Sequence, residues 1–477
     1  MTFSLQEATL YKLQQWMEEG VESAVSLTTQ YMQRIADVDR AGPCLRAVIE
    51  LNPDALYIAE KLDAERAAGH IRGVLHGIPV LIKDNINTAD HMHTTAGSLA
   101  LADSFAPADA HLVQRLRHAG AIILGKTNLT EMANFMAFQM KNGYSARGGQ
   151  TLNPYGIGRL DVGGSSSGSA AAVAANLCAV AVGTETSGSI LNPASCNSLV
   201  GIKPTLGLIS RTGIIPITYT QDTAGPMART VQDAALLLGV LAGSDERDAA
   251  TLLQPPELPD YPACLSADGL RGARIGINRA LLEQYNEEEC AIMEASIEAM
   301  RHAGAIIVEG VDLPHTAGEN FDVLLYEFKS ALNRYLSTLG SHTAVRSLKE
   351  MIDFNHLHHR EALRYGQEML LKAEYETSGT MTEPAYINAR LRLGRQARVD
   401  GIDRLLQTHH LDAIFSPGFT DTPATVGYPA ITVPAGYRRD GMPFGISFMG
   451  TAYSEPTLLR IAYGFEHVVP ARRSPLL

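Results

Sequence analysis

The chain has 477 residues, which exceeds the size at which a single hydrophobic core usually stops growing. We therefore expect either one large domain with a sizeable insertion or two domains. Hydrophobic residues make up 45% of the chain and charged residues 19%, which excludes a disordered or fibrous protein. The formal net charge is −12 and no run of Lys and Arg is present, which argues against a nucleic-acid partner.

The start of the sequence and the cysteines bear on location and on metal binding. The first residues show neither the basic nor the apolar segment of a secretory signal, and no apolar stretch reaches the length of a membrane span. We therefore expect a cytoplasmic protein without a membrane partner. The five cysteines lie far apart and form no CxxC pair, which argues against a disulfide framework and a zinc site. We expect reduced thiols and neither a metal nor another cofactor.

Hydrophobic spacing predicts secondary structure along the first half of the chain. Two helices are expected near the start, over 5–17 and 23–38. From about residue 72, short apolar runs alternate with helical stretches. The predicted strands are 80–82, 121–124 and 177–182, and the predicted helices are 111–118 and 166–176. This alternation predicts an α/β fold, a mixed central sheet flanked by helices on both faces.

The second half of the chain divides at about residue 411. Residues 245–411 are richer in helix formers and in charge. They contain predicted helices at 286–302, 320–339 and 385–408 and a predicted strand at 305–308. Strands are expected again at 413–415, 430–433 and 445–448, followed by a helix at 458–467. We expect an α/β core built from both ends of the chain, with 245–411 as a helix-rich insertion that forms a lid or one wall of the substrate site.

The segment between residues 163 and 233 is the most informative for chemistry. The run GGSSSGS at 163–169 opens an Ala-rich helix, and GTETSGSI at 183–190 follows the next strand. A flexible linker does not place apolar helices and strands between its glycines. A phosphate-binding loop would carry the pattern GxxxxGK[ST], which is missing. We therefore favour a catalytic segment over both alternatives.

Amide hydrolysis requires an activated nucleophile, a base and N–H donors for the oxyanion. The small residues before Ser189 allow a tight turn that points successive backbone N–H groups at that serine. The predicted oxyanion hole consists of Thr186, Ser187, Gly188 and Ser189. A histidine base is not evident, because none of the 15 histidines lies in a recognisable triad motif and no GxSxG elbow is present.

These motifs resemble those of the amidase signature family. The family pattern comprises a GGSS-type run, GT[DE]xxGS[IV], a GLKPT-type segment and an LDxxGPxxR-type segment. They stand here at 163–169, 183–190, 201–205 and 221–229. The resemblance extends upstream to GIPVLIKDN at 77–85 and downstream to YPAITVPAG at 428–436. It implies that residues 1–477 form a single amidase domain with the fold described above.

The resemblance also implies the catalytic residues. The family's nucleophile falls on Ser189, its bridging serine on Ser165 and its lysine on Lys83, with the family's separation of 24 residues between the two serines. In family members a cis peptide bond precedes the bridging serine. The implied mechanism passes a proton from Ser189 through Ser165 to a neutral Lys83, whose burial would lower its pKa. Ser166 and Thr184 are expected to support the site by hydrogen bonds, or to serve only as turn and helix-cap residues.

The sequence departs from the family pattern at two places, neither of which changes the three catalytic candidates. LNP at 191–193 replaces an Arg common after the nucleophile motif, and RLDV at 159–162 replaces a common Ser-Pro pair. The motifs at 183–186, 214–217 and 221–229 look more like the peptide amidase branch than the A subunit of tRNA-dependent amidotransferases. We therefore expect hydrolysis of carboxylic or C-terminal peptide amides to the acid plus ammonia or an amine, through an acyl-enzyme, by a monomer or homodimer.

Two alternatives to this activity stay open. One is an amidotransferase A-type subunit that acts only within a complex. The other is a metal-dependent amidohydrolase, suggested by two histidine clusters whose spacing does not match a zinc site. The histidines concerned are His91, His93, His356, His358 and His359.

Overall fold

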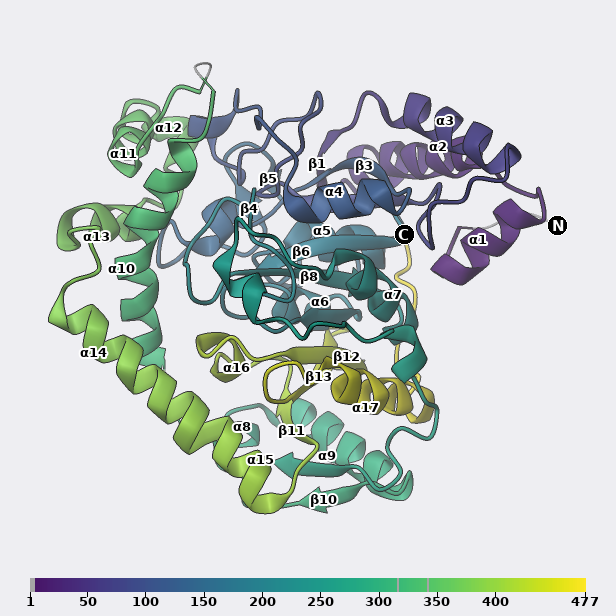
Figure 1. Cartoon of the computed structure of the whole chain (residues 1–477), viewed down its shortest axis with the longest axis vertical. Helices are drawn as coiled ribbons and strands as arrows, with labels where there is room; N and C mark the ends of the chain where they lie inside the picture. Colours follow the sequence, from purple (N-terminus) through teal and green to yellow (C-terminus); the bar gives the residue numbers. More distant parts are fainter. Residues whose placement is uncertain (1–4, 315–316, 341–342) are drawn as a thin grey trace.

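One mixed sheet of 11 strands runs through the molecule (Figure 1). The computed structural model describes residues 5–314, 317–340 and 343–477. In spatial order the strands are β1 (Val48–Leu51), β3 (Ile122–Thr127), β2 (Pro79–Lys83), β6 (Val180–Glu185), β8 (Thr223–Ala228), β7 (Val200–Lys203), β12 (Ala430–Tyr437), β13 (Pro443–Met449), β11 (Ala413–Pro417), β9 (Arg274–Ile277) and β10 (Ile306–Val308). A separate hairpin pairs β4 (Tyr144–Ser145) with β5 (Gly149–Gln150).

The two halves of the sheet come from the two ends of the chain. Strands from the first half of the sequence meet those from the second half where β7 pairs antiparallel with β12. On the first side, β2 lies parallel to both β3 and β6 and is buried along its whole length. Strand pairing of this kind confirms the predicted mixed α/β sheet.

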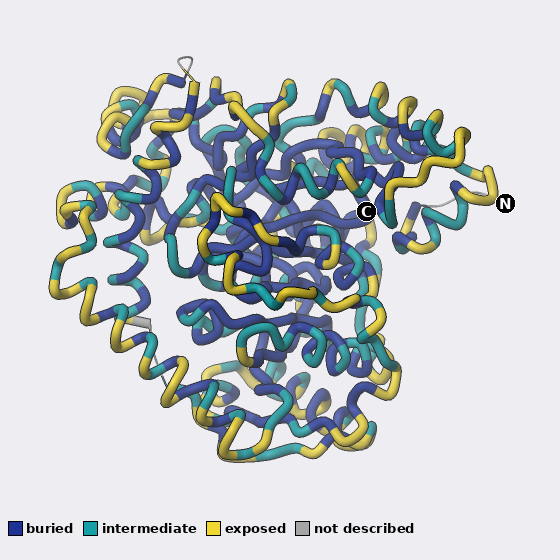
Figure 2. Tube along the Cα trace, viewed as in Figure 1, coloured by how far each residue is buried: buried dark blue, intermediate teal, exposed yellow. Residues whose placement is uncertain are grey.

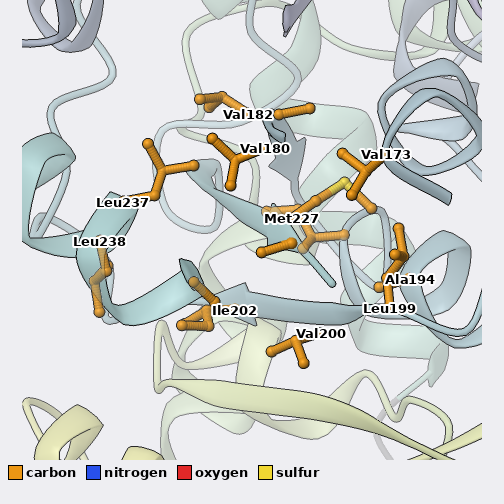
Figure 3. Packing of buried hydrophobic residues seen from close by; sticks show 14 of the residues in the cluster. Val173, Val180, Val182, Ala194, Leu199, Val200, Ile202, Met227, Leu237 and Leu238 are labelled. Carbon is orange, nitrogen blue, oxygen red and sulfur yellow. The ribbon is translucent and has the colours of Figure 1, made fainter. Parts of the chain in front are cut away.

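Helices cover both faces of this sheet. Figure 3 shows Leu237 and Val173, from two different helices, on opposite sides of the strand that carries Met227. The helices are α1 (Leu10–Glu18), α2 (Ala24–Arg34), α3 (Ala55–Ala67), α4 (His111–His118), α5 (Ser167–Ala174), α6 (Leu191–Cys196), α7 (Val231–Leu241), α8 (Arg279–Leu282), α9 (Glu287–His302), α10 (Ala317–Leu336), α11 (Leu348–Leu357), α12 (His359–Ala362), α13 (Glu368–Glu376), α14 (Pro384–Leu393), α15 (Arg404–His409), α16 (Thr422–Thr425) and α17 (Glu455–Val468). None of the helices within the described ranges is both long and apolar enough to cross a membrane.

Helix α5 is buried at every position, as the dark centre of Figure 2 illustrates. Its small side chains let the helix approach the sheet closely. A Cβ added at Gly168 would lie 2.4 Å from the backbone oxygens of Ala47 and Asn128. Because only glycine fits there, the start of α5, and with it Ser165 and Ser166, is held tightly against β3 and its neighbours.

The segment 245–411 contributes both helices and strands. Helix α10 packs on residues of the first half, Met132, Phe135 and Ile215 among them. From Pro384 to His409 the chain forms one helical arm, α14, a π-helical stretch at Gly394–Asp403 and α15, which runs along the left side of Figure 1. Its first part packs on α10 through Ala389 and Leu393, and its last part packs on the sheet through Ile402 and Leu405. The same segment also adds β9 and β10 to the edge of the sheet.

Candidate active site

Lys83 is the last residue of β2 and lies fully buried in the middle of the first half of the sheet. Its Nζ donates hydrogen bonds to Ser165 Oγ at 2.8 Å, to Ser166 Oγ at 3.0 Å and to the Thr184 backbone oxygen at 3.2 Å. These three acceptors use the full donor capacity of an ammonium group. The lysine is therefore held in one position, with Ser165 as its nearest partner.

Burial lowers the pKa of Lys83 to about 7, because a charged ammonium is poorly solvated inside the protein. The carboxyl groups of Glu185 and Asp222 act in the opposite direction but are outweighed. A substantial fraction of this lysine is therefore neutral at physiological pH. In that form Nζ has a lone pair that can accept the proton of the Ser165 hydroxyl.

Ser165 and Ser189 lie on two adjacent loops. The Ser166 backbone N–H donates to the Ser189 carbonyl oxygen at 3.1 Å, and Thr130 N–H donates to the Ser165 carbonyl oxygen at 3.0 Å. The Gly164–Ser165 peptide bond is cis, as the resemblance implied. Ser189 is 7% exposed, and its hydroxyl makes no hydrogen bond with any residue that the structure describes. The Ser165 hydroxyl thus contacts Lys83 directly, while that of Ser189 remains unengaged.

The loop 186–189 turns sharply at Gly188, which has a φ of +78°. A Cβ at this position would lie 2.6 Å from the ring of Phe419, so both the backbone conformation and the space require glycine. On the far side of Ser189, Glu185 Oε2 accepts hydrogen bonds from Ile190 N–H at 2.7 Å and from Leu191 N–H at 3.0 Å. The turn that presents Ser189 is therefore fixed from both sides.

The predicted oxyanion residues have separate anchors. Thr186 Oγ1 donates to Asp222 at 2.6 Å, and Ser187 Oγ donates to Asp421 at 2.7 Å. Within the described ranges, the backbone N–H groups of Ser187 and Ser189 have no acceptor. Two donors are therefore available at this turn for an oxygen that develops negative charge.

Ser166 and Thr184 both contact the lysine's surroundings. Ser166 Oγ accepts from Lys83 and donates to the Thr184 carbonyl oxygen at 3.0 Å. The Thr184 hydroxyl accepts from Asn85 Nδ2 at 3.0 Å. These bonds fix the two oxygens that, together with Ser165, surround the amine.

Three further residues hold the site together and were not singled out from the sequence: Asn85, Glu185 and Asp222. Each lies inside a motif quoted above, at 77–85, 183–190 and 221–229. The Asp222 carboxylate accepts four hydrogen bonds, from the hydroxyls of Thr186 and Thr218 and the N–H groups of Ile217 and Thr218. Their position within the motifs is the signal that could have identified them.

The histidine clusters lie elsewhere. His91 pairs with Asp54 at 2.7 Å, and His93 pairs with Glu50 at 2.8 Å. His359 Nδ1 lies 3.3 Å from the backbone oxygen of His356. Among the described residues, no three or more His, Cys, Asp or Glu side chains converge in a way that could hold a metal ion.

Comparison with known proteins gives matches over most or nearly all of the chain. The family model "Amidase" matches residues 26–427. The crystal structure of native peptide amidase from Stenotrophomonas maltophilia is 49% identical, with a TM-score of 0.93 over 98% of both chains. An amidase family protein from Bacillus anthracis is 40% identical, with a TM-score of 0.94 over 99% of this chain and 93% of that one. A "Probable amidase" of Arabidopsis thaliana is 41% identical over 99% of this chain and 92% of its own length.

Proposed function

Because the chain belongs to the amidase signature family, we propose that it is a serine amidase with Ser189 as nucleophile, Ser165 as proton relay and Lys83 as base. The observation that carries this proposal is the 2.8 Å contact between the buried amine of Lys83 and the Ser165 hydroxyl, next to the loop that presents Ser189. A lysine whose pKa is lowered to about 7 supplies a base at neutral pH without a histidine.

The proposed reaction begins with attack of Ser189 Oγ on the amide carbon. As the C–O bond forms, the proton of Ser189 passes to Ser165, whose own proton passes to the neutral amine of Lys83. The carbonyl π electrons move to the oxygen, giving a tetrahedral intermediate. The C–N bond then breaks, and the proton on Lys83 returns through Ser165 to the leaving nitrogen. Water repeats the same steps on the acyl-enzyme and releases the acid.

The loop 186–189 supplies the oxyanion hole in this proposal. The backbone N–H groups of Ser187 and Ser189 have no acceptor among the described residues, and the turn is fixed by Glu185 and Asp222. Preorganised donors of this kind contribute about 3 kcal/mol each to the transition state. Gly188 is required because the turn needs its backbone conformation and leaves no room for a side chain.

We further propose C-terminal peptide amides as the substrates, with ammonia as the leaving group. The support is the 49% identity to a peptide amidase over nearly the full length of both chains. We assign residues 245–411 to one wall of the substrate site. Helix α10 of this segment shares a hydrophobic cluster with Ile215, which itself lines a small cavity beside Thr184 and Thr186.

The test is an assay of the purified single chain against peptide amides, aryl amides and fatty amides, with release of ammonia or amine as the readout. We expect peptide amides to give the highest kcat/KM, in the presence or absence of a strong chelator. Activity that depends on partner proteins would instead support an amidotransferase subunit. Activity lost in chelator and restored by a divalent metal would support a metal-dependent enzyme.

A further inference from the structure

A cleft of about 650 Å³ lies between helix α10 and the loops that precede β8. Its lining comes from four separate parts of the chain, 87–109, 211–222, 247–249 and 331–338. Lys83, Ser165 and Ser189 are not part of this lining. Asp222 lies at its inner end, with all its hydrogen bonds directed at residues 186, 217 and 218. The cleft is therefore separate from the candidate catalytic residues.

Much of the cleft wall is apolar. The aliphatic side chains that line it are those of Pro107, Ala108, Ile214, Pro216, Ala249 and Ala331. A concave site with apolar walls and a few polar groups is the usual form of a small-molecule site. The apolar part suits a hydrocarbon or aromatic group.

The cleft also carries arginine side chains with unused hydrogen-bond donors. Arg334 on α10 is exposed and makes no ion pair or side-chain hydrogen bond with the residues that the structure describes. Arg247 uses its Nε and Nη2 atoms on Asp245, at 2.9 and 3.3 Å, which leaves its Nη1 available. Arg211 differs, because Asp248 and the Tyr219 backbone oxygen occupy it. Arg334 and Arg247 are therefore the cations open to a ligand.

The acidic residues in the lining already accept hydrogen bonds from the protein. Asp248 binds Arg211, and Asp109 binds Arg117 at 3.0 Å and accepts from Ala89 N–H at 2.7 Å. The Asp222 carboxylate is satisfied by its four donors. Arg334 is thus the lining cation without an acidic partner among the described residues, whereas Asp222, at the inner end, is bound by uncharged donors.

Asn87 supplies a further hydrogen-bond donor on the cleft wall. It is only 5% exposed and lines the cleft. Its Oδ1 accepts the Tyr335 hydroxyl at 2.7 Å, whereas its Nδ2 donates to no acceptor in the described part of the chain. This amide donor is open to the cleft. An oxygen of a bound molecule can accept its hydrogen bond.

We propose that this cleft binds a small organic carboxylate that carries an apolar or aromatic body. Arg334 and Arg247 hold the carboxylate through charge-assisted hydrogen bonds, and Asn87 Nδ2 donates to a ligand oxygen. The body lies against the apolar side chains of the wall. This site lies outside the catalytic machinery proposed above and does not depend on it.

The test uses 3-phenylpropionate as the probe and its neutral counterpart 3-phenylpropanol, titrated into the full chain by calorimetry. We expect the carboxylate to bind at least tenfold more tightly than the alcohol or inorganic phosphate. Arg334→Gln should weaken binding of the carboxylate at least fivefold, and Asn87→Asp should weaken it further by placing a carboxyl group against the ligand. Arg439→Gln is the matched control, because that arginine is 91% exposed and lies outside the cleft. It should leave the affinity unchanged.

A crystal soaked with 3-(4-bromophenyl)propionate locates the probe by anomalous scattering. Bromine density in the cleft is the expected result, and density only beside Ser189 would overturn the proposal. Equal binding of acid and alcohol, or unchanged affinity in Arg334→Gln, would overturn it too. Because these measurements need no turnover, their failure would leave the proposed amidase activity untouched.

Discussion

A single buried lysine can act as a base only where the protein disfavours its charged form and still satisfies its hydrogen bonds. Lys83 meets both conditions, since it is fully buried and has three oxygen partners. The nearby carboxyl groups of Glu185 and Asp222 keep the pKa from falling further. Individual residues around the amine therefore set the pH range in which the proposed relay operates.

Activity should rise with pH through the pKa of Lys83. That pKa is lowered to about 7, and only the neutral amine accepts a proton, so kcat/KM should increase tenfold per pH unit below pH 7 and level off above it. A pH profile of kcat/KM on a peptide amide checks this. His91→Gln and His93→Gln should keep the profile, because both side chains pair with acidic residues away from the site. A profile that stayed flat from pH 5 to pH 9 would exclude Lys83 as the base.

Ser189→Ala should abolish turnover while leaving the fold intact. The loss of kcat is expected to be on the order of 10⁴-fold or more, because no other atom can form the acyl-enzyme. Its hydroxyl makes no hydrogen bond with the described residues, so the Tm should stay within about 2 °C of that of the unmodified protein. Ser187→Ala is the matched control, since that hydroxyl binds Asp421 and only its N–H belongs to the proposed oxyanion hole. Covalent labelling of Ser189→Ala by a serine-directed phosphonate would contradict the assignment.

At the scale of structural elements, the turn between β6 and α6 positions the nucleophile. It combines a left-handed glycine, a carboxylate that binds the first N–H groups of α6 and a hydroxyl tied to Asp222. Substitutions in this turn should therefore affect catalysis more than stability.

Gly188→Ala should reduce kcat at least about 100-fold, comparable to the loss of one oxyanion donor. The added Cβ would lie 2.6 Å from the Phe419 ring and would shift the turn. Gly441→Ala is the matched control: its φ is +89°, yet a Cβ there meets nothing within 4 Å. It should cost a little stability and no activity. Equal activity of Gly188→Ala and Gly441→Ala would show that the turn does not position donors.

The elements predicted from the sequence agree with the structure where hydrophobic periodicity is strong. Strand 80–82 lies within β2, and helix 385–408 corresponds to the arm from Pro384 to His409. The first helix begins at Leu10 instead of residue 5, because Thr9 caps it by accepting Lys12 N–H and Glu7 has a positive φ. Strand β9 was not predicted, since four residues at the edge of a long helical segment give too short a pattern.

Some features of the site follow from the sequence motifs, and others arise only from the tertiary structure. The family resemblance pointed to Lys83, Ser165 and Ser189 as catalytic candidates, and the fold brings their loops together although the first and last lie more than 100 residues apart. The four-donor environment of Asp222 could not be predicted, because its partners on residues 217 and 218 reach it only after the loop has folded back. Nor does any local pattern encode a cleft lined by four distant segments.

For the molecule as a whole, the match to the amidase family confirms the resemblance drawn from the motifs, and the 11-stranded sheet explains how one chain brings them together. Strands β2 and β6 are neighbours in this sheet, and Lys83 and the nucleophile turn both lie at the same ends of these parallel strands. Residues that bury charge for catalysis must be supported by the stability of the remaining fold.

The lowered pKa of Lys83 predicts how this residue affects the free energy of unfolding at different pH values. In the unfolded chain the amine keeps its proton up to its ordinary pKa of 10.5, whereas the folded chain loses it above about pH 7. Between these values the unfolded state binds more protons, so the contribution of Lys83 to the free energy of unfolding rises with pH and is lowest below pH 7. Lys83→Met removes this dependence. Relative to the unmodified protein, the variant should lose stability steadily as the pH increases from 7 to 10.5, by a difference on the order of 4 kcal/mol.

Denaturant unfolding of both proteins at several pH values between 6 and 10 measures this difference. Lys61→Met is the matched control, because Lys61 is exposed on α3 and should give the same pH dependence as the unmodified protein. If the curves of Lys83→Met and the unmodified protein stayed parallel across this range, the amine would hold its ordinary pKa in the folded state. Lys83 would then be almost wholly protonated at neutral pH, and it could not serve as the base that the proposed mechanism requires.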